Sequence, residues 1–303
     1  KARANMEPLI LKGIRDFDLE HTFACGQCFR WNRQPDGSYL GVAHGKVLRL
    51  ERVDADLILH HVTEEDYQQI WREYLDLDRD YRALKAHLAS RDEILGEATR
   101  FGHGIRILNQ DPWETLVSFL LSQNSNIPRI KQCIEALCVS FGEPISSGLT
   151  EGSFEEGGTG PRYFAFPTPE RLASLSLSDL DLCRLGYRAK YVLETAKVVA
   201  LDGGKTLAGL RGGSESEAME YLLSLCGVGP KVASCIMLFA LKQHHSFPVD
   251  VWVRKVMEEY YGLHGATPNQ IDAFATERFG SHRGFAQQYL FYYIREFEKE
   301  HSC

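Results

Sequence analysis

The sequence lacks three features that would place it in other classes of protein. No apolar run approaches the roughly 20 residues that a membrane-spanning helix needs, and no segment has the pattern of a signal peptide. Only eight cysteines occur in 303 residues, and their spacing does not indicate a disulfide-rich secreted scaffold. We therefore expect reduced thiols in an intracellular protein.

A strongly basic charge balance is also missing. The formal net charge is −7 and the isoelectric point is about 5.9, which argues against a protein covered with positive charge. Nucleic-acid binding stays compatible with this charge, because a local cationic face or helix N-termini can hold phosphate on an acidic protein. Hydrophobic residues make up 44% of the chain, as in ordinary globular proteins, so the length suffices for one large or two ordinary domains.

The residue pattern changes along the chain and predicts two domains. Residues 1–6 are interpreted as a cloning remnant or a disordered N-terminus. Residues 39–62 carry short β-branched and apolar runs interrupted by glycine and aspartate, which predicts an antiparallel meander. From about residue 79 the pattern is almost entirely helical. We predict an α+β fold, with a small domain of antiparallel sheet and helices at 7–98 and an all-α domain at 99–303.

Capping residues support several of the predicted helices. Thr63 and Asp111 each precede a helical pattern with an acidic residue at the capping-box spacing, and Pro112 follows Asp111 at the favoured first position. A long Gly-rich loop is predicted at 143–167. Further helices are predicted at 127–141, 169–176, 178–185, 188–201, 214–225, 230–242, 250–260, 268–279 and 284–299.

The segment LCGVGPKVASCI, residues 225–236, places a lysine where a merely solvated lysine would be disfavoured. A tight turn joins two helices here, giving a helix–hairpin–helix over about 214–242, and Lys231 falls in the first turn of the second helix, beside N–H groups that repel cations. The unpaired N–H groups of such a turn can hold a phosphate without sequence preference. The alternative is an ordinary interhelical turn with a surface lysine. The turn consists of Gly227, Val228 and Gly229.

A carboxylate follows this lysine at a distance that suggests a partner. Asp250 lies 19 residues after Lys231, in the segment FPVDVWVRK. Asp250 is placed to cap the next helix, a role worth about 1 kcal/mol. The alternative role is that of an acid/base carboxylate that faces the amine.

A Gly-rich hairpin, a lysine and a Pro-Val-Asp segment in this arrangement resemble the helix–hairpin–helix DNA glycosylases with the Gly/Pro…Asp pattern. Four other segments are similar, in the same order, to the 8-oxoguanine DNA glycosylase/AP lyase family. They are CGQCFRW (25–31), QNSNIPRI (123–130), LGYRAKYV (185–192) and GFAQQYLF (284–291). The resemblance extends from about residue 9 to residue 299. It implies a base-excision repair enzyme that flips 8-oxoguanine out of duplex DNA, preferably opposite cytosine, and cleaves the resulting abasic site.

The resemblance assigns the chemistry to two residues. Lys231 matches the lysine that attacks the sugar C1′ and forms a Schiff base, after which β-elimination can follow. Asp250 matches the aspartate that stabilises the sugar cation and assists proton transfer. Attack needs a neutral amine, and we expect the helix N-terminus and low-dielectric walls to disfavour the charged form of Lys231.

The resemblance also implies a damaged-base site. Gly26 matches the glycine whose carbonyl accepts the N7–H that 8-oxoguanine has and guanine lacks. Cys235 and Phe291 match residues that pack on the base, and Gln287 matches the glutamine that reads its Watson–Crick edge. Without the resemblance, these residues would be interpreted as a turn glycine and core side chains. The CGQC segment could also be a redox or zinc pair, but no second ligand pair or strand–helix context accompanies it.

A further group is implied to fill the gap in the duplex. Asn124, Arg129 and Arg188 match residues that contact the orphaned cytosine, and Tyr187 matches a ring wedged into the helix. The alternative for these residues is a set of polar side chains at helix ends. One departure concerns Trp252, which occupies the position of a family histidine that contacts a phosphate.

The remaining expectations concern partners and alternatives. We expect double-stranded DNA containing 8-oxoguanine as the partner, no membrane, a monomer, no cofactor and no metal. The C-terminal region holds only Cys303, so we predict no iron–sulfur cluster. A location in the cytoplasm or nucleoid follows for a bacterium, and in the nucleus for a eukaryote. The alternatives are an alkylpurine DNA glycosylase of the same fold and a non-catalytic DNA-binding protein built on the hairpin.

Overall fold

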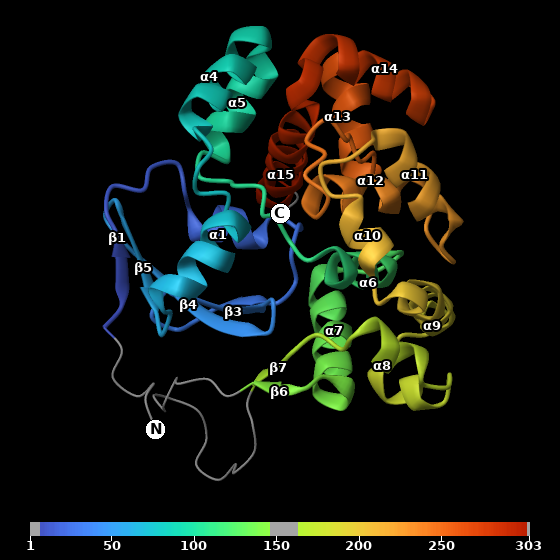
Figure 1. The fold of residues 1–303 in the computed structure, drawn as a ribbon. Coiled ribbons are helices and arrows are strands. Elements are labelled where there is room, and N and C mark those ends of the chain that lie inside the picture. Colours follow the sequence, from blue (N-terminus) through green and yellow to red (C-terminus); the bar gives the residue numbers. More distant parts are fainter. Residues whose placement is uncertain (1–6, 146–162, 302–303) are drawn as a thin grey trace.

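A five-stranded sheet lies beside a larger body of helices in the computed structural model (Figure 1), which describes residues 7–145 and 163–301. The sheet has the order β1-β5-β4-β3-β2, and every neighbouring pair is antiparallel. The predicted meander corresponds to β3–β5. The strands are β1 (Leu9–Leu11), β2 (Trp31–Arg33), β3 (Tyr39–Ala43), β4 (Lys46–Val53) and β5 (Asp56–His60). Residues 1–6, and most of the predicted loop at 143–167, lie outside the described residues.

The helices follow the predicted order, and the α+β fold is confirmed. The predicted helix at 178–185 is a short 3-10 helix, η2, and the predicted helix at 188–201 ends in another, η3. The helices of the N-terminal part are α1 (Leu19–Ala24), α2 (Glu64–Asp66), the π-helix η1 (Tyr67–Trp71), α3 (Arg72–Tyr74), α4 (Tyr81–Arg91) and α5 (Glu93–Phe101).

The remaining elements form the helical body. In order they are α6 (Pro112–Ser122), α7 (Ile127–Phe141), the strand pair β6 (Pro144–Ile145) and β7 (Tyr163–Phe164), α8 (Pro169–Ala173), η2 (Asp179–Cys183), α9 (Arg188–Val199), η3 (Ala200–Asp202), α10 (Lys205–Gly209), α11 (Glu215–Ser224), α12 (Pro230–Phe239), α13 (Val251–Tyr261), α14 (Pro268–Phe279), η4 (Gly280–His282) and α15 (Arg283–His301). The predicted cap of α6 is present, since Asp111 accepts the N–H of Glu114 at 2.8 Å. Thr63 likewise caps α2.

The sheet and α1 share a small aromatic core. The Trp31 ring is stacked on Phe23 of α1, with ring centroids 4.2 Å apart. Trp31 also fills the space over Gly41 of β3, where a methyl group would lie only 2.2 Å from the indole ring. This packing fixes both ends of the segment 25–30 that joins α1 to β2. Segment 25–30 contains the predicted base-reading glycine, so the sheet acts as its support.

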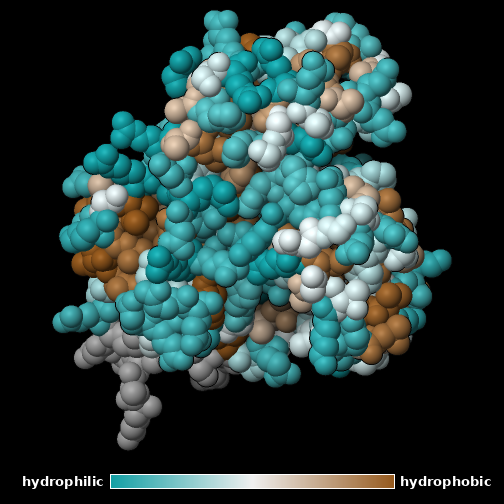
Figure 2. Space-filling view, turned by 45° about the horizontal axis from the view of Figure 1, so that its top comes forward, coloured by the Kyte–Doolittle hydropathy of each residue, from teal (hydrophilic) through white to brown (hydrophobic). Residues whose placement is uncertain are grey.

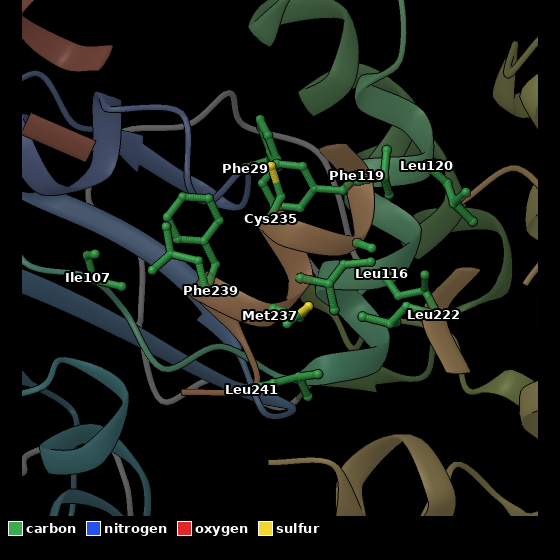
Figure 3. Packing of buried hydrophobic residues seen from close by; sticks show 14 of the residues in the cluster. Phe29, Ile107, Leu116, Phe119, Leu120, Leu222, Cys235, Met237, Phe239 and Leu241 are labelled. Atoms are coloured by element: carbon green, nitrogen blue, oxygen red, sulfur yellow. The ribbon is translucent and has the colours of Figure 1, made fainter. Parts of the chain in front are cut away.

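The larger core is centred on α6 and α12. Phe119 of α6 and Phe239 of α12 are stacked with ring centroids 5.6 Å apart, and Phe119 also meets Phe29 edge-on. Figure 3 shows the sulfur of Cys235 pointing to the same side as the rings of Phe29 and Phe119. Helix α12 is therefore apolar on nearly all sides, and only its N-terminal turn carries a charged residue.

Helices α4 and α5 pack with the helical body. Tyr81, Leu88 and Leu95 belong to the larger hydrophobic core, although they precede the boundary that the sequence predicts near residue 98. Phe285 of α15 meets the ring of Tyr81 edge-on, and α15 lies directly beside the α4–α5 pair (Figure 1). Hydrophobic packing thus joins these two helices to the C-terminal helix across 200 residues of sequence.

One largely buried ion pair connects the two parts of the molecule. Arg30, just before β2, faces Glu114 in the first turn of α6, with Nη1 and Oε2 3.5 Å apart. The same guanidinium donates to the carbonyl of Phe164 in β7 at 2.5 Å. Burial raises the pKa of Glu114 to about 7 even though the charge of Arg30 opposes the shift. Glu114 therefore exchanges a proton near neutral pH.

The raised pKa of Glu114 predicts that the free energy of unfolding depends on pH, and that Glu114→Gln removes this dependence. Between pH 4.5 and 7 the folded protein holds the Glu114 proton that the unfolded chain has released, so the free energy of unfolding falls as pH rises, by up to about 1.4 kcal/mol per unit. Glu114→Gln has no proton to exchange and should lack this component. Urea unfolding at pH 5, 6 and 7 measures the change of the free energy of unfolding with pH, with Glu220→Gln at an exposed position as the control. Equal slopes in wild type and Glu114→Gln would contradict the expected coupling.

The surface agrees with the absence of long apolar runs in the sequence. Figure 2 shows one face, on which hydrophobic side chains form separate patches divided by hydrophilic surface. In the described ranges 7–145 and 163–301, none of the helices has the length and apolar character needed to cross a membrane.

Candidate active site

The predicted helix–hairpin–helix is present, formed by α11, the turn at 225–229 and α12. Gly227 has a φ of +80°, and a methyl group there would lie 2.4 Å from the Tyr191 ring, so both the backbone and the packing require glycine. The hairpin is tied to its neighbours by two side chains. Gln123 donates to the Gly227 carbonyl at 3.0 Å and Thr195 donates to the Cys226 carbonyl at 3.1 Å. The turn is therefore a rigid platform for the first turn of α12.

Lys231 is partly buried at the start of α12. Its Nζ lies over the ring of Phe119, 5.4 Å from the centroid, which is a favourable place for a cation. Cys235 lies one helical turn further along α12 and is 3% exposed. The amine is thus held between an aromatic face and a buried thiol, rather than extended into solvent.

Asp250 is the helix cap that the sequence predicts, and its carboxylate also lies within electrostatic range of Lys231. Its Oδ1 accepts the N–H groups of Trp252 at 3.0 Å and Val253 at 2.9 Å, so it is the N-cap of α13. The same carboxylate is close enough to Lys231 for each charge to shift the pKa of the other. The cap therefore holds a carboxylate within electrostatic range of the amine.

The ionisation of this pair corrects one expectation. The pKa of Lys231 is raised, first by negative charge on Cys235 and further by Asp250, and these outweigh the effect of burial. Burial raises the pKa of the Cys235 thiol, so Cys235 is uncharged at neutral pH and Asp250 is the anion near the amine there. Burial also raises the pKa of Asp250, against the backbone N–H donors. Lys231 is thus an ammonium at neutral pH, and the part of the rise in its pKa that Cys235 causes takes effect only where that thiol ionises.

The predicted base-reading glycine lies in a strongly braced loop. Gly26 has a φ of +82°, in the region that favours glycine. Gln27, next to it, is 1% exposed, and its side chain spans the loop with hydrogen bonds to the carbonyls of Thr22 and Arg106 and from the N–H of Leu108. No hydrogen bond between described residues ends on the Gly26 carbonyl. The carbonyl therefore remains available as an acceptor.

Helix α15 brings the other predicted base-site residues to this loop. A methyl group on Gly26 would lie 3.4 Å from the Phe291 ring, so loop and ring are in contact. Gln287 is 4% exposed, and its Oε1 is buried without a hydrogen-bond partner among the described residues. An unpaired buried acceptor of this kind is costly and is a candidate for a ligand contact.

Two residues of α15 that the sequence analysis did not select also contact the loop. Gln288 is 2% exposed and donates to the Cys25 carbonyl at 2.9 Å. Arg295 donates to the Ala24 carbonyl at 2.7 Å. The spacing of Arg295, four residues after Phe291 on the same helix, is the signal that could have identified it.

The three residues predicted to contact the orphaned cytosine lie together with the predicted wedge, Tyr187. They line one open hollow with Ser125 and Asn126. Asn124 and Arg129 are exposed, Tyr187 is 52% exposed, and Asn124 has a φ of +48°. Arg188 differs, because it is 7% exposed and its guanidinium donates to the carbonyls of Gln123 and Asn124. Arg188 therefore shapes the loop of Asn124, and Arg129 presents the exposed guanidinium.

Two other positions bear on the expectations. Trp252 is partly buried and packs against the larger core, so it reinforces the start of α13. Asp18, His21 and His103 bring three potential metal-ligand atoms within 4.8 Å of one another. None of the predicted site residues belongs to this group.

Two family models match the chain. The 8-oxoguanine DNA glycosylase N-terminal domain matches residues 9–116, and the model of HhH-GPD superfamily base excision DNA repair proteins matches residues 117–280. The two matches meet inside α6. The N-glycosylase/DNA lyase OGG1 of Arabidopsis thaliana is 32% identical over 292 residues, which cover 91% of this chain and 77% of that protein.

Further relatives cover nearly the whole chain. A probable N-glycosylase/DNA lyase of Methanothermobacter thermautotrophicus is 28% identical across 93% of this chain and 95% of that protein. The 8-oxoguanine glycosylase/lyase of Clostridium acetobutylicum, solved with double-stranded DNA containing cytosine opposite 8-oxoguanine, is 40% identical and superposes with a TM-score of 0.88 over 97% of both chains. The chain therefore belongs to the 8-oxoguanine DNA glycosylases of the HhH-GPD superfamily of base excision DNA repair proteins.

Proposed function

We propose that this protein removes 8-oxoguanine from duplex DNA and then cleaves the abasic site, with Lys231 as the nucleophile. The observation that supports this most is the shared site of Lys231 and Asp250 on two helix N-termini. Attack of the Lys231 amine on C1′ displaces the base, and the resulting Schiff base allows β-elimination. Phosphate binding by the hairpin would need neither residue.

Asp250 supplies charge at the reacting sugar. As the glycosidic bond breaks, positive charge develops on the sugar, and a fixed carboxylate stabilises it without reorganisation. The proton of Lys231 must leave before attack, because its raised pKa keeps it as an ammonium at neutral pH. Asp250 is the acceptor beside it.

The base leaves the stack and enters the space between the Gly26 loop and α15. The Gly26 carbonyl accepts the N7–H of 8-oxoguanine, and guanine would present a bare acceptor there. Gln287 reads the Watson–Crick edge with its unpaired Oε1 and its amide group. Phe291 and Cys235 contact the faces of the base.

The orphaned cytosine is held by Asn124 and Arg129, with Tyr187 as the wedge and Arg188 as support for the loop. A single-turnover excision assay on 8-oxoguanine duplex with borohydride trapping tests the whole proposal. The alkylpurine glycosylase alternative predicts no trapped complex and excision only from a duplex with an alkylated purine, and the non-catalytic alternative predicts binding alone. We propose that the protein acts as a monomer without a cofactor, in the nucleoid of a bacterium or the nucleus of a eukaryote.

Arg129→Ala should remove most of the preference for cytosine. Cytosine offers acceptors at O2 and N3 that suit guanidinium donors, and each good contact gives about 1–3 kcal/mol of discrimination. We expect wild type to excise 8-oxoguanine opposite cytosine at least ~10-fold faster than opposite adenine. Single-turnover rates on the four opposite-base duplexes measure this, with Arg171→Ala at an exposed position of α8 as the control. If Arg129 contacts only phosphate, its loss would slow all four duplexes alike.

A further inference from the structure

Arg295 shares one face of α15 with two residues of the proposed base site. Gln287, Phe291 and Arg295 follow one another at intervals of four residues, so their side chains lie in a row. Arg295 is 6% exposed. An arginine is rarely buried to this extent unless its donors have partners.

Only part of this guanidinium is occupied. Nη2 donates to the Ala24 carbonyl at 2.7 Å and Nε donates to Glu296 at 2.7 Å. The guanidinium carbon lies 5.0 Å from the centroid of the Phe291 ring. Nη1, by contrast, is buried and makes no hydrogen bond within the part of the chain that the structure describes. A charged donor left unpaired in this way is costly in the free protein.

The unpaired nitrogen borders the base-reading glycine. A methyl group on Gly26 would lie 3.2 Å from Arg295 Nη1 and 3.4 Å from the Phe291 ring. The charge of Arg295 also opposes, as a minor contribution, the rise in the pKa of Asp250, so the guanidinium lies within electrostatic range of the proposed reaction site. The free donor and the Phe291 ring therefore both lie against Gly26, and Gln287 lies one helical turn from Phe291 on the same face of α15.

We propose that Arg295 is a specificity-determining residue whose Nη1 donates to the C8 oxygen of the extruded base, an inference that rests on the proposed function. 8-Oxoguanine differs from guanine at two adjacent atoms, with a hydrogen on N7 and an oxygen on C8. If the Gly26 carbonyl accepts the N7–H, a donor beside Gly26 meets the oxygen on C8. Guanine would place an unprotonated N7 against the Gly26 carbonyl and a C8–H against the guanidinium. Both protein groups would then lack a hydrogen-bond partner.

A pair of substrates isolates this contact. 8-Thioguanine keeps the N7–H and replaces the C8 oxygen with sulfur, a weaker acceptor. We would measure single-turnover excision of both bases opposite cytosine by wild type, Arg295→Met and Arg295→Lys, with Arg82→Met at an exposed position of α4 as the control. Borohydride trapping on an abasic-site duplex, which contains no base, reports whether Lys231 and Asp250 remain intact.

Arg295→Met should slow 8-oxoguanine excision by about 10-fold or more, the effect of losing a hydrogen bond from a charged donor. Its rate on 8-thioguanine should fall less, so the oxygen-to-sulfur rate ratio should approach one, while trapping on the abasic duplex stays at the wild-type level. Arg295→Lys should also lower the ratio, because an ammonium cannot hold the Ala24 carbonyl and reach the base together. This second variant keeps the charge and most of the packing should Arg295→Met not fold.

The possible outcomes distinguish failure of the Arg295 proposal from failure of the proposed function. An unchanged rate ratio in both Arg295 variants, with or without slower excision, would show that Arg295 only positions the loop and would overturn the proposal. A wild-type protein that excises neither base would overturn the proposed function and this inference together.

Discussion

Lys231→Gln will bind 8-oxoguanine duplex with similar affinity to wild type and form no borohydride-trapped complex. Glutamine keeps much of the length and polarity of lysine but has no amine to attack C1′. We expect the base to stay in place because its proposed contacts, from the Gly26 loop, Cys235 and α15, do not involve the Lys231 amine. Gel analysis after borohydride reduction, beside a binding titration, measures both properties. Lys205→Gln, at an exposed position of α10, is the control.

The wild-type trapping rate should also depend on pH with a definite sign. The pKa of Lys231 is raised, so the neutral amine is the minor form at neutral pH and its fraction grows as pH rises. Single-turnover trapping should therefore accelerate from neutral to alkaline pH. Trapped complex from Lys231→Gln at the wild-type level would assign the nucleophile to another residue.

Asp250→Asn should slow base excision by about 10²–10³-fold, the usual cost of removing a preorganised electrostatic contact to a transition state. The substitution tests the charge alone, because asparagine caps helices as well as aspartate does. The Oδ1 acceptor for Trp252 and Val253 is retained, so α13 should remain intact and only the negative charge is lost. Single-turnover excision measures the effect.

A matched control comes from a second capping aspartate. Asp111→Asn keeps the cap of α6 in the same way and should excise at the wild-type rate. Thermal unfolding of both variants confirms that the caps survive. An Asp250→Asn protein as fast as Asp111→Asn would leave Asp250 as a helix cap without a catalytic role.

Local signals in the sequence predict much of the fold and several residues of the candidate site. The caps at Thr63, Asp111 and Asp250 depend on contacts within three residues, and the hairpin depends on a Gly-x-Gly turn, so both are visible in a short segment. The resemblance supplied Gly26 because its motif is also short.

The rest depends on contacts that no local pattern carries. Gln288 reaches the Cys25 carbonyl across 263 residues, and Arg295 reaches Ala24 across 271. The pKa of Lys231 was predicted in the wrong direction because the sequence shows the helix N-terminus but not how closely Cys235 and Asp250 approach the amine. The packing of α4 and α5 with α15 likewise appears only once the chain has folded.

The hydrogen bond between Arg295 and the Ala24 carbonyl can form only late in synthesis. The ribosome makes the chain from its N-terminus, and contacts between distant segments form late because the intervening chain must first be closed into a loop. When translation has just passed α13, the nascent chain already contains Lys231 and Asp250. It does not yet contain α15, the helix that contacts the Gly26 loop. The proposed nucleophile and its carboxylate are therefore synthesised before α15, the helix that carries the proposed base-reading side chains.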